Sequence, residues 1–130
     1  MALITVGEKL KYYIVSPYRS VLEDYKKRGL SEQEAIAQIE YFARLGCASV
    51  KRLEGIPVSP ILAFAGVYDE YDEREKIEEA CEVLLKCCQT VCVVDTPYNQ
   101  YSSGIKKELE IARLNKIPVI IFKYKDKGQK

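Results

Sequence analysis

Residues 91–122 read VCVVDTPYNQYSSGIKKELEIARLNKIPVIIF, and the order of elements in this stretch indicates the architecture of the chain. The apolar run at its start predicts a buried strand that stops at the polar residues 95–97. A polar loop follows, and residues 105–114 then carry apolar side chains at helical spacing. Residues 117–122 predict a last buried strand. Continuously apolar strands joined by a helix are typical of parallel βαβ units with helices on both faces of the sheet.

The chain before residue 91 shows the same alternation of strands and helices. Residues 11–15 (KYYIV) predict a first strand, a short strand is expected near residues 56–58, and a Ser-Pro pair follows each of them. Ser31 and Glu34 form a capping box that starts a long helix, which Gly46 is predicted to end. The helical patterns cover residues 21–28, 31–45 and 77–88. These elements predict an α/β fold, a doubly wound three-layer sandwich with a mainly parallel sheet of four to five strands.

The length and composition suit one globular domain, which we expect to span residues 1–130 with a basic tail from about residue 123. The 20 Lys and Arg residues and 19 Asp and Glu residues leave a net charge of +1, so the chain lacks the basic field of a polynucleotide-binding protein. No apolar run approaches the roughly 20 residues that span a bilayer. The start of the chain also lacks a secretory pattern. We therefore expect neither a polynucleotide nor a membrane partner.

The chain contains no histidine, which excludes Ser-His-Asp and Cys-His catalysis and zinc sites with histidine ligands. The cysteines are odd in number and their spacing does not match a zinc knuckle. They are Cys47, Cys81, Cys87, Cys88 and Cys92. We expect buried, reduced thiols in a cytoplasmic protein, with no bound metal and no cofactor. Any chemistry must therefore use carboxylates, hydroxyls, thiols or cations.

Ligands of doubly wound sheets bind at the carboxyl ends of the strands. This rule places the loop at residues 16–19, the Ser-Pro pair at residues 59–60 and the loop at residues 95–104 on one edge of the predicted sheet. The chain has neither a Gly-x-Gly-x-x-Gly fingerprint nor a Walker loop. A phosphate site of either standard type is therefore not expected.

Two segments at this edge nevertheless suit an anion. Ser102, Ser103 and Gly104 immediately precede a helix, whose first backbone N–H groups are free to bind one. Ser16 and Arg19 follow the first strand and offer a hydroxyl and a guanidinium. The alternative interpretations are a plain N-cap for Ser103 and a loop hydroxyl for Ser102.

Glu108 lies four residues after Gly104, one turn into the last predicted helix. Its position is near the apolar side of that helix, which carries Ile105 and Ala112, and so near the strand ends. A carboxylate there is costly unless it is hydrogen-bonded or used in chemistry. The alternative is an exposed helix carboxylate like Glu110.

Five tyrosines fall in or near the same loops: Tyr12, Tyr13, Tyr18, Tyr98 and Tyr101. An aromatic ring with a polar tip suits stacking on a base while bonding a sugar. Most tyrosines are instead half-buried packing residues, and that alternative stays open.

Four segments, taken in order, resemble the nucleoside 2-deoxyribosyltransferase-like superfamily, and more closely a small phage and bacterial branch of it. They are residues 12–19 (YYIVSPYR), 59–61 (SPI), 103–108 (SGIKKE) and 116–119 (KIPV). The resemblance covers nearly the whole chain, from residue 11 to residue 122. It implies a flavodoxin-like fold and cleavage of the N-glycosidic bond of deoxynucleosides or deoxynucleotides.

The resemblance also implies roles for individual residues. Glu108 matches a helix glutamate that attacks C1′ and forms a covalent glycosyl-enzyme. Tyr12 matches a first-strand tyrosine that orients this nucleophile. Glu82 is the best match for a second catalytic acid, with Glu78 and Asp72 as alternatives.

For the ligand, the resemblance implies that Ser102, six residues before the glutamate, binds a 5′-phosphate. Ser16 and Arg19 fall in the loop that cradles sugar or phosphate. Pattern and resemblance together give the candidate ligand-binding set Ser16, Tyr18, Arg19, Ser59, Asp95, Tyr101, Ser102, Ser103 and Gly104.

We therefore expect an N-glycosidase or deoxyribosyltransferase that acts on a nucleoside or nucleoside 5′-phosphate in the cytoplasm of a bacterial or phage-infected host cell. One alternative is a non-catalytic module that binds or sequesters a nucleotide-derived small molecule in the same cleft. A weaker alternative is an NAD glycohydrolase. Relatives complete their sites across a dimer interface, so a homodimer or higher homo-oligomer is expected. The apolar last strand and residues 123–130 are candidates to reach the second copy.

Overall fold

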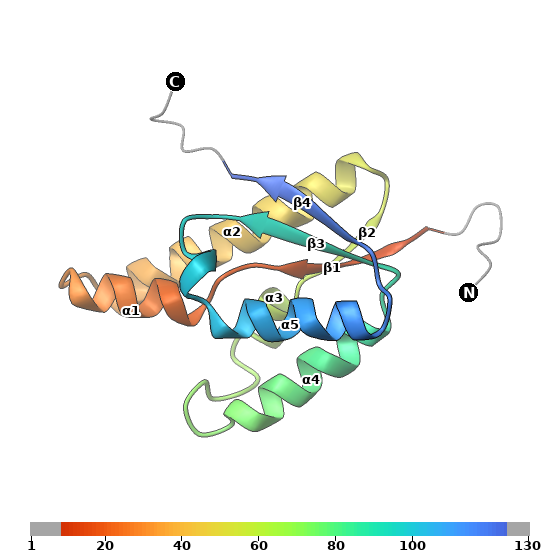
Figure 1. Cartoon of the computed structure of the whole chain (residues 1–130). Coiled ribbons are helices and arrows are strands. Elements are labelled where there is room, and N and C mark those ends of the chain that lie inside the picture. Colours follow the sequence, from red (N-terminus) through yellow and green to blue (C-terminus); the bar gives the residue numbers. More distant parts are fainter. Residues whose placement is uncertain (1–8, 125–130) are drawn as a thin grey trace.

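The computed structural model describes residues 9–124, so most of the predicted basic tail lies outside the described residues. Four parallel strands form one sheet in the order β2-β1-β3-β4 (Figure 1). The strands are β1 (Lys11–Val15), β2 (Ile56–Val58), β3 (Thr90–Asp95) and β4 (Val119–Lys123). The helices are α1 (Arg19–Lys27), α2 (Glu32–Arg52), α3 (Pro60–Phe64), α4 (Arg74–Lys86) and α5 (Ser103–Leu114), with a 3-10 turn at Asn99–Tyr101.

Helices cover both faces of this sheet, α2 on one side and α4 with α5 on the other (Figure 1). Helices α1 and α3 contact α2. The prediction of a three-layer α/β fold with a parallel sheet of four to five strands is therefore confirmed. The strand order changes direction between β1 and β3, and such a switch point is where open α/β sheets bind ligands at their carboxyl ends.

Alternation along the strands divides the core into two clusters. Tyr13 and Val15 of β1 face α4 and α5, where they pack with Leu85. Ile14, between them, faces α2 and packs with Val50. Successive strand residues point to opposite faces, so the two clusters interleave along one strand. Alternate residues of β1 therefore face α2 on one side of the sheet and α4 and α5 on the other.

Gly46 does not end the second helix, contrary to the prediction, because α2 continues to Arg52. The glycine instead allows close packing of α2 on the sheet. A Cβ atom at this position would lie 2.6 Å from Cγ2 of Ile14 and 2.7 Å from Cγ2 of Val94. Both neighbours are buried and cannot move aside.

We expect Gly46→Ala to lower the free energy of unfolding by about 1–3 kcal/mol, the usual cost of overpacking a core. Chemical denaturation of the purified chain measures it. Ala37→Gly, at an exposed position of the same helix, is the matched control and gives the helix-propensity contribution alone. If Gly46→Ala were stabilising, as propensity alone predicts, the close approach of α2 to β1 and β3 would be contradicted.

The last strand is exposed rather than buried, which corrects a second prediction. β4 lies at the edge of the sheet, and the exposed fractions of Val119, Ile120 and Ile121 are 42%, 36% and 64%. Its apolar sequence resembles that of a central strand. Within residues 9–124, however, no further strand or helix covers it.

The five cysteines are free thiols, but they are not uniformly buried as predicted. Cys88 and Cys92 are buried, Cys47 and Cys81 are half-buried, and Cys87 is exposed. Cys87 is the C-cap of α4 and, unlike Cys88, does not belong to the core cluster. Within the described part of the chain, no helix has both the length and the apolar character needed to cross a membrane.

Candidate functional site

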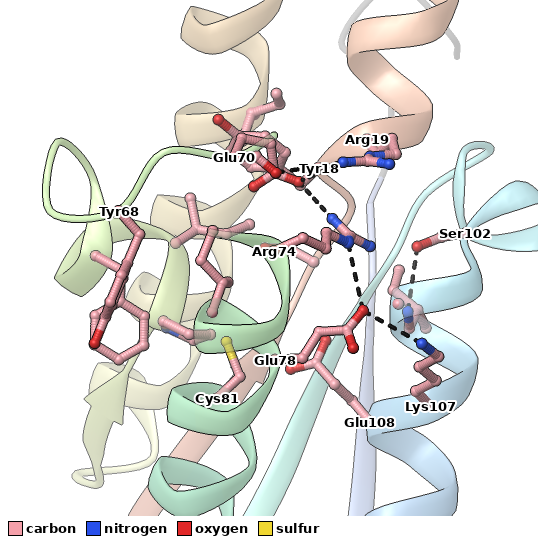
Figure 2. A pocket seen from close by; sticks show the side chains of 18 of the residues that line it. Tyr18, Arg19, Tyr68, Glu70, Arg74, Glu78, Cys81, Ser102, Lys107 and Glu108 are labelled. Carbon is pink, nitrogen blue, oxygen red and sulfur yellow. Dashed lines mark hydrogen bonds and ion pairs between the residues drawn. The ribbon is translucent and has the colours of Figure 1, made fainter. Parts of the chain in front are cut away.

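A pocket of about 890 Å³ lies where β1 and β3 end. Its wall includes Ser16, directly after β1, and Ser102, after β3. Side chains of all five helices, α1 to α5, complete it, and Figure 2 shows part of this lining. The pocket therefore occupies the switch point of the sheet, where the sequence predicted a ligand.

Glu108 reaches into this pocket from α5 and meets Tyr13 of β1. The Tyr13 hydroxyl donates a hydrogen bond to Oε2 of Glu108. Tyr13 is fully buried in the core, which fixes its ring and therefore the position of the carboxylate. Two elements that are far apart in sequence thus hold one functional group between them.

Burial raises the pKa of Glu108 to about 7, and the hydrogen bond from Tyr13 opposes this rise. The pKa of Tyr13 is raised strongly, first by burial and then by the charge of Glu108. Tyr13 is therefore a neutral donor at physiological pH. Glu108 changes its charge close to neutrality, as a group used in chemistry often does.

Cys81 of α4 lies beside this pair (Figure 2). Burial, together with the charge of Glu108, raises the pKa of its thiol to about 11. The thiol is therefore protonated at neutral pH and is not an activated nucleophile. It lines the pocket beside the carboxylate as an uncharged thiol.

Tyr12 does not orient Glu108, which corrects the role implied by the resemblance. Its side chain packs on the α2 face of the sheet, with Val50 and Ile14. Adjacent strand residues point to opposite faces, so Tyr12 and Tyr13 cannot both face α5. Tyr13 takes the expected position.

Two buried hydroxyls in the pocket wall have no hydrogen-bond partner within residues 9–124. They are the Oγ atoms of Ser16 and Ser20, both in residues that are 7% exposed. A buried polar group without a partner costs about 1–3 kcal/mol. Arg19 lies between them in sequence, and the first turn of α1 contains no acidic residue. This corner of the pocket therefore offers donors to a polar, anionic group.

Ser102 is the N-cap of α5, and its Oγ accepts a hydrogen bond from the backbone N–H of Ile105 at 3.2 Å. The alternative interpretation of Ser103 as the N-cap is wrong, because Ser103 is the first residue of the helix. Ser102, Ser103 and Gly104 all line the pocket. The first turn of α5 contains no acidic residue either. Two helix N-termini thus meet the same cavity.

A chain of ion pairs links α1, α4 and α5 beside these residues (Figure 2). Glu70 pairs with Arg19, at 3.3 Å from Nη2, and with Arg74 of α4. Arg74 also pairs with Glu78, which in turn lies 3.3 Å from Nζ of Lys107. All three cations that line the pocket are therefore held by glutamates.

The profile of a protein family described as domain of unknown function DUF7768 matches residues 10–122. The chain belongs to the DUF7768 family. No curated protein matches it. Among solved structures, it is similar to a 2-deoxyribosyltransferase from Bacillus psychrosaccharolyticus, with a TM-score of 0.54 and 16% sequence identity. The similarity covers 87% of this chain and 72% of the other. It shows that the DUF7768 domain has the flavodoxin-type α/β fold of that enzyme.

The other predicted ligand-binding residues of this DUF7768 domain are divided. Tyr18 and Tyr101 line the pocket. Ser59 does not, because it is the N-cap of α3 and accepts a hydrogen bond from the backbone N–H of Leu62 at 3.2 Å. Asp95 also lies outside, exposed at the end of β3 and in register with Lys123. In the loop at residues 95–104, the predicted ligand site is therefore correct for residues 101–104, which line the pocket, but not for residues 95–100, which do not.

Glu82, the predicted second acid, lines the pocket from α4 but is half exposed and pairs with Lys86 at 2.8 Å. Of its two alternatives, Glu78 lines the pocket and Asp72 does not. Within residues 9–124 no group of three or more His, Cys, Asp or Glu side chains is arranged to hold a metal ion.

Ser20, Glu70 and Arg74 were missed by the sequence analysis. Ser20 has the clearest signal, since it lies one residue after Arg19 in the loop that was expected to bind a ligand. Glu70 and Arg74 fall in an acidic stretch that resembles an ordinary helix N-terminus. Only the fold brings them to α1.

Proposed function

We propose that this DUF7768 domain cleaves the N-glycosidic bond of a nucleoside or nucleoside 5′-phosphate, either by hydrolysis or by transfer of the sugar. The observation that carries the proposal is the pair of Glu108 and Tyr13. It sets a carboxylate with a raised pKa in a pocket at the switch point of the sheet. Nucleophilic carboxylates of retaining glycosidases work beside an oxocarbenium-like centre in the same manner. The likeness to a 2-deoxyribosyltransferase supports the fold on which this chemistry is proposed.

In the proposed reaction the ionised Glu108 attacks C1′ of the sugar. The bond from C1′ to the base nitrogen breaks, its electron pair leaves with the base, and a glycosyl ester forms. Water, or an acceptor base, then attacks C1′ and loses a proton, and the electron pair of the ester bond returns to Glu108. Tyr13 holds the attacking oxygen in place through its hydroxyl.

The phosphate of a nucleotide substrate is proposed to bind where α1 and α5 begin. Ser16 and Arg19 offer a hydroxyl and a guanidinium there, and Ser103 and Gly104 belong to the first turn of α5. Both helix N-termini favour an anion because backbone N–H groups at the start of a helix point away from it and the positive end of the helix dipole lies there. Tyr101, which is 74% exposed at the pocket, is proposed to stack on the base.

The test is release of free base from a panel of ribo- and deoxyribonucleosides and their 5′-monophosphates, followed by chromatography. A second base added as acceptor separates transfer from hydrolysis. Release that depends on Glu108 is the expected result. Thermal stabilisation by an intact nucleotide without any base release would contradict cleavage and favour the non-catalytic binding module.

A second copy of this chain is proposed to cover β4. Val119, Ile120 and Ile121 form an exposed apolar edge strand, and such edges pair readily with another strand. A cytoplasmic protein is proposed as well, because its five cysteines are free thiols.

We expect the wild-type chain to form a dimer or larger assembly in light scattering, and Ile121→Lys to form a monomer, because a lysine at the edge opposes strand pairing. Leu53→Lys is the matched control, since Leu53 is similarly exposed but lies after α2. A wild-type monomer at micromolar concentration would overturn the proposed pairing, as would an assembly that Leu53→Lys disrupts equally.

A further inference from the structure

The pocket is strongly acidic although the chain as a whole is nearly neutral. Eight glutamates line it against three cationic side chains, whereas the net charge of the chain is +1. The three cations are already paired with Glu70 and Glu78, and Glu40 and Glu82 pair with Arg44 and Lys86 outside the lining. Within residues 9–124, the lining glutamates without an ion pair are therefore Glu23, Glu75, Glu79 and Glu108. An excess of negative charge along one wall favours a positively charged group of a ligand placed beside it.

Helix α4 supplies half of these glutamates. Glu75, Glu78, Glu79 and Glu82 follow the spacing i, i+3, i+4 and i+7, so they share one side of the helix, and all four line the pocket. Within residues 9–124, Glu75 and Glu79 have no ion-pair or hydrogen-bond partner. Their negative charge is therefore available to a ligand.

Proton donors, in contrast, are scarce beside Glu108. The Tyr13 hydroxyl and the Cys81 thiol lie beside its carboxylate, and burial disfavours loss of a proton from each. The chain has no histidine, and Glu82 is ion-paired at the solvent. An uncharged base needs a proton from such an acid in order to leave C1′. A positively charged base does not, since it leaves as a neutral molecule.

The pocket also contains the donors for an anion. The buried Oγ atoms of Ser16 and Ser20 have no partner within residues 9–124, and they lie where α1 begins, next to Arg19. A ligand that matches both the unpaired glutamates of α4 and these hydroxyl donors carries a positive charge as well as a phosphate.

We infer that the substrate is a nucleoside 5′-phosphate whose glycosidic nitrogen belongs to a positively charged ring, such as a pyridinium or an N7-alkylated purine. The inference rests on the proposed function and narrows it. Glu108 attacks C1′, and the electron pair of the breaking C1′–N bond neutralises the ring nitrogen, so the base departs without a proton. Water then attacks C1′, the ester bond returns its electron pair to Glu108, and one proton passes to the solvent in each turnover.

The experiment compares two matched pairs of probes. Nicotinamide mononucleotide is set against its uncharged dihydro form, and 7-methylguanosine 5′-monophosphate against guanosine 5′-monophosphate. Base release is measured by chromatography and proton release by pH-stat. The Glu108→Gln variant gives the background, which corrects for the greater intrinsic lability of cationic glycosides.

Above that background, we expect kcat/KM for the charged member of each pair to exceed that for the neutral member by at least about tenfold, with one proton released per base. The double variant Glu75→Gln/Glu79→Gln should lower this preference about tenfold, since it removes two unpaired charges from the wall. Glu110→Gln is the matched control, because Glu110 is exposed on α5, pairs with Arg113 and does not line the pocket. Thermal denaturation establishes that the double variant is folded.

Equal or faster cleavage of the neutral members would overturn this inference and leave the proposed function standing. A charge preference unchanged in the folded double variant would also overturn it. Cleavage of neither member of either pair, nor of the wider nucleoside panel, would instead overturn the proposed function itself.

Discussion

Glu108→Gln is expected to lower Glu108-dependent base release by at least about 1,000-fold, because the amide cannot act as a nucleophile at C1′. The substitution preserves the shape of the side chain, and an amide oxygen still accepts from the Tyr13 hydroxyl. Initial rates with a substrate from the panel measure the effect. Glu110→Gln, on the exposed side of the same helix, should retain wild-type activity. A Glu108→Gln enzyme with more than a tenth of wild-type activity would remove Glu108 from the reaction.

Stability distinguishes loss of chemistry from loss of fold. The pKa of Glu108 is raised from an ordinary value near 4.5 to about 7, so between these values the folded chain binds more protons than the unfolded one. Wild-type stability therefore falls as pH rises through this window and stays lower above it. Glu108→Gln lacks this penalty. It should melt near the wild-type temperature at pH 5 and above it at pH 8, which thermal denaturation checks.

Tyr13→Phe is expected to lower kcat/KM about 10- to 100-fold, because the carboxylate loses the donor that holds it in position. It should also change the pH profile. In the wild type, activity should rise with pH to half its maximum near pH 7, as Glu108 ionises. The Tyr13 hydrogen bond lowers the pKa of Glu108, so its removal should move this rise to higher pH.

Tyr12→Phe is the matched control for this substitution. It removes a hydroxyl from the adjacent residue of β1, on the α2 face of the sheet, and should leave the rate and the pH profile unchanged. A Tyr13→Phe profile that keeps its midpoint, or a Tyr12→Phe enzyme with the larger defect, would contradict the assignment of the positioning role to Tyr13.

The sequence predicts the fold well where hydrophobic periodicity is strong. The apolar runs of β1 and β3 and the amphipathic α5 lie where they were expected. Gly46 was misinterpreted because a glycine can end a helix or admit a close neighbour, and only the packing on Ile14 distinguishes these. β4 was misjudged for a different reason. An apolar run does not tell whether a strand has neighbours on both sides.

The candidate site was predictable in part. The position of Glu108 near the apolar side of its helix indicated a carboxylate with a special environment. The choice between Tyr12 and Tyr13 depends on which of the two side chains points to the face of the sheet that α5 covers. A comparison of motifs does not resolve this. Asp95 and Ser59 have typical ligand chemistry, but one lies exposed at the end of β3 and the other caps α3. Such competing roles are decided by geometry, not by residue type.

The most direct test of the central claim is mass spectrometry of the enzyme quenched during turnover. We expect the intact mass to increase by that of the sugar or sugar phosphate, and peptide mapping to place the adduct on Glu108. An enzyme that releases base while Glu108 stays unmodified, or that carries the adduct on another residue, would contradict the account.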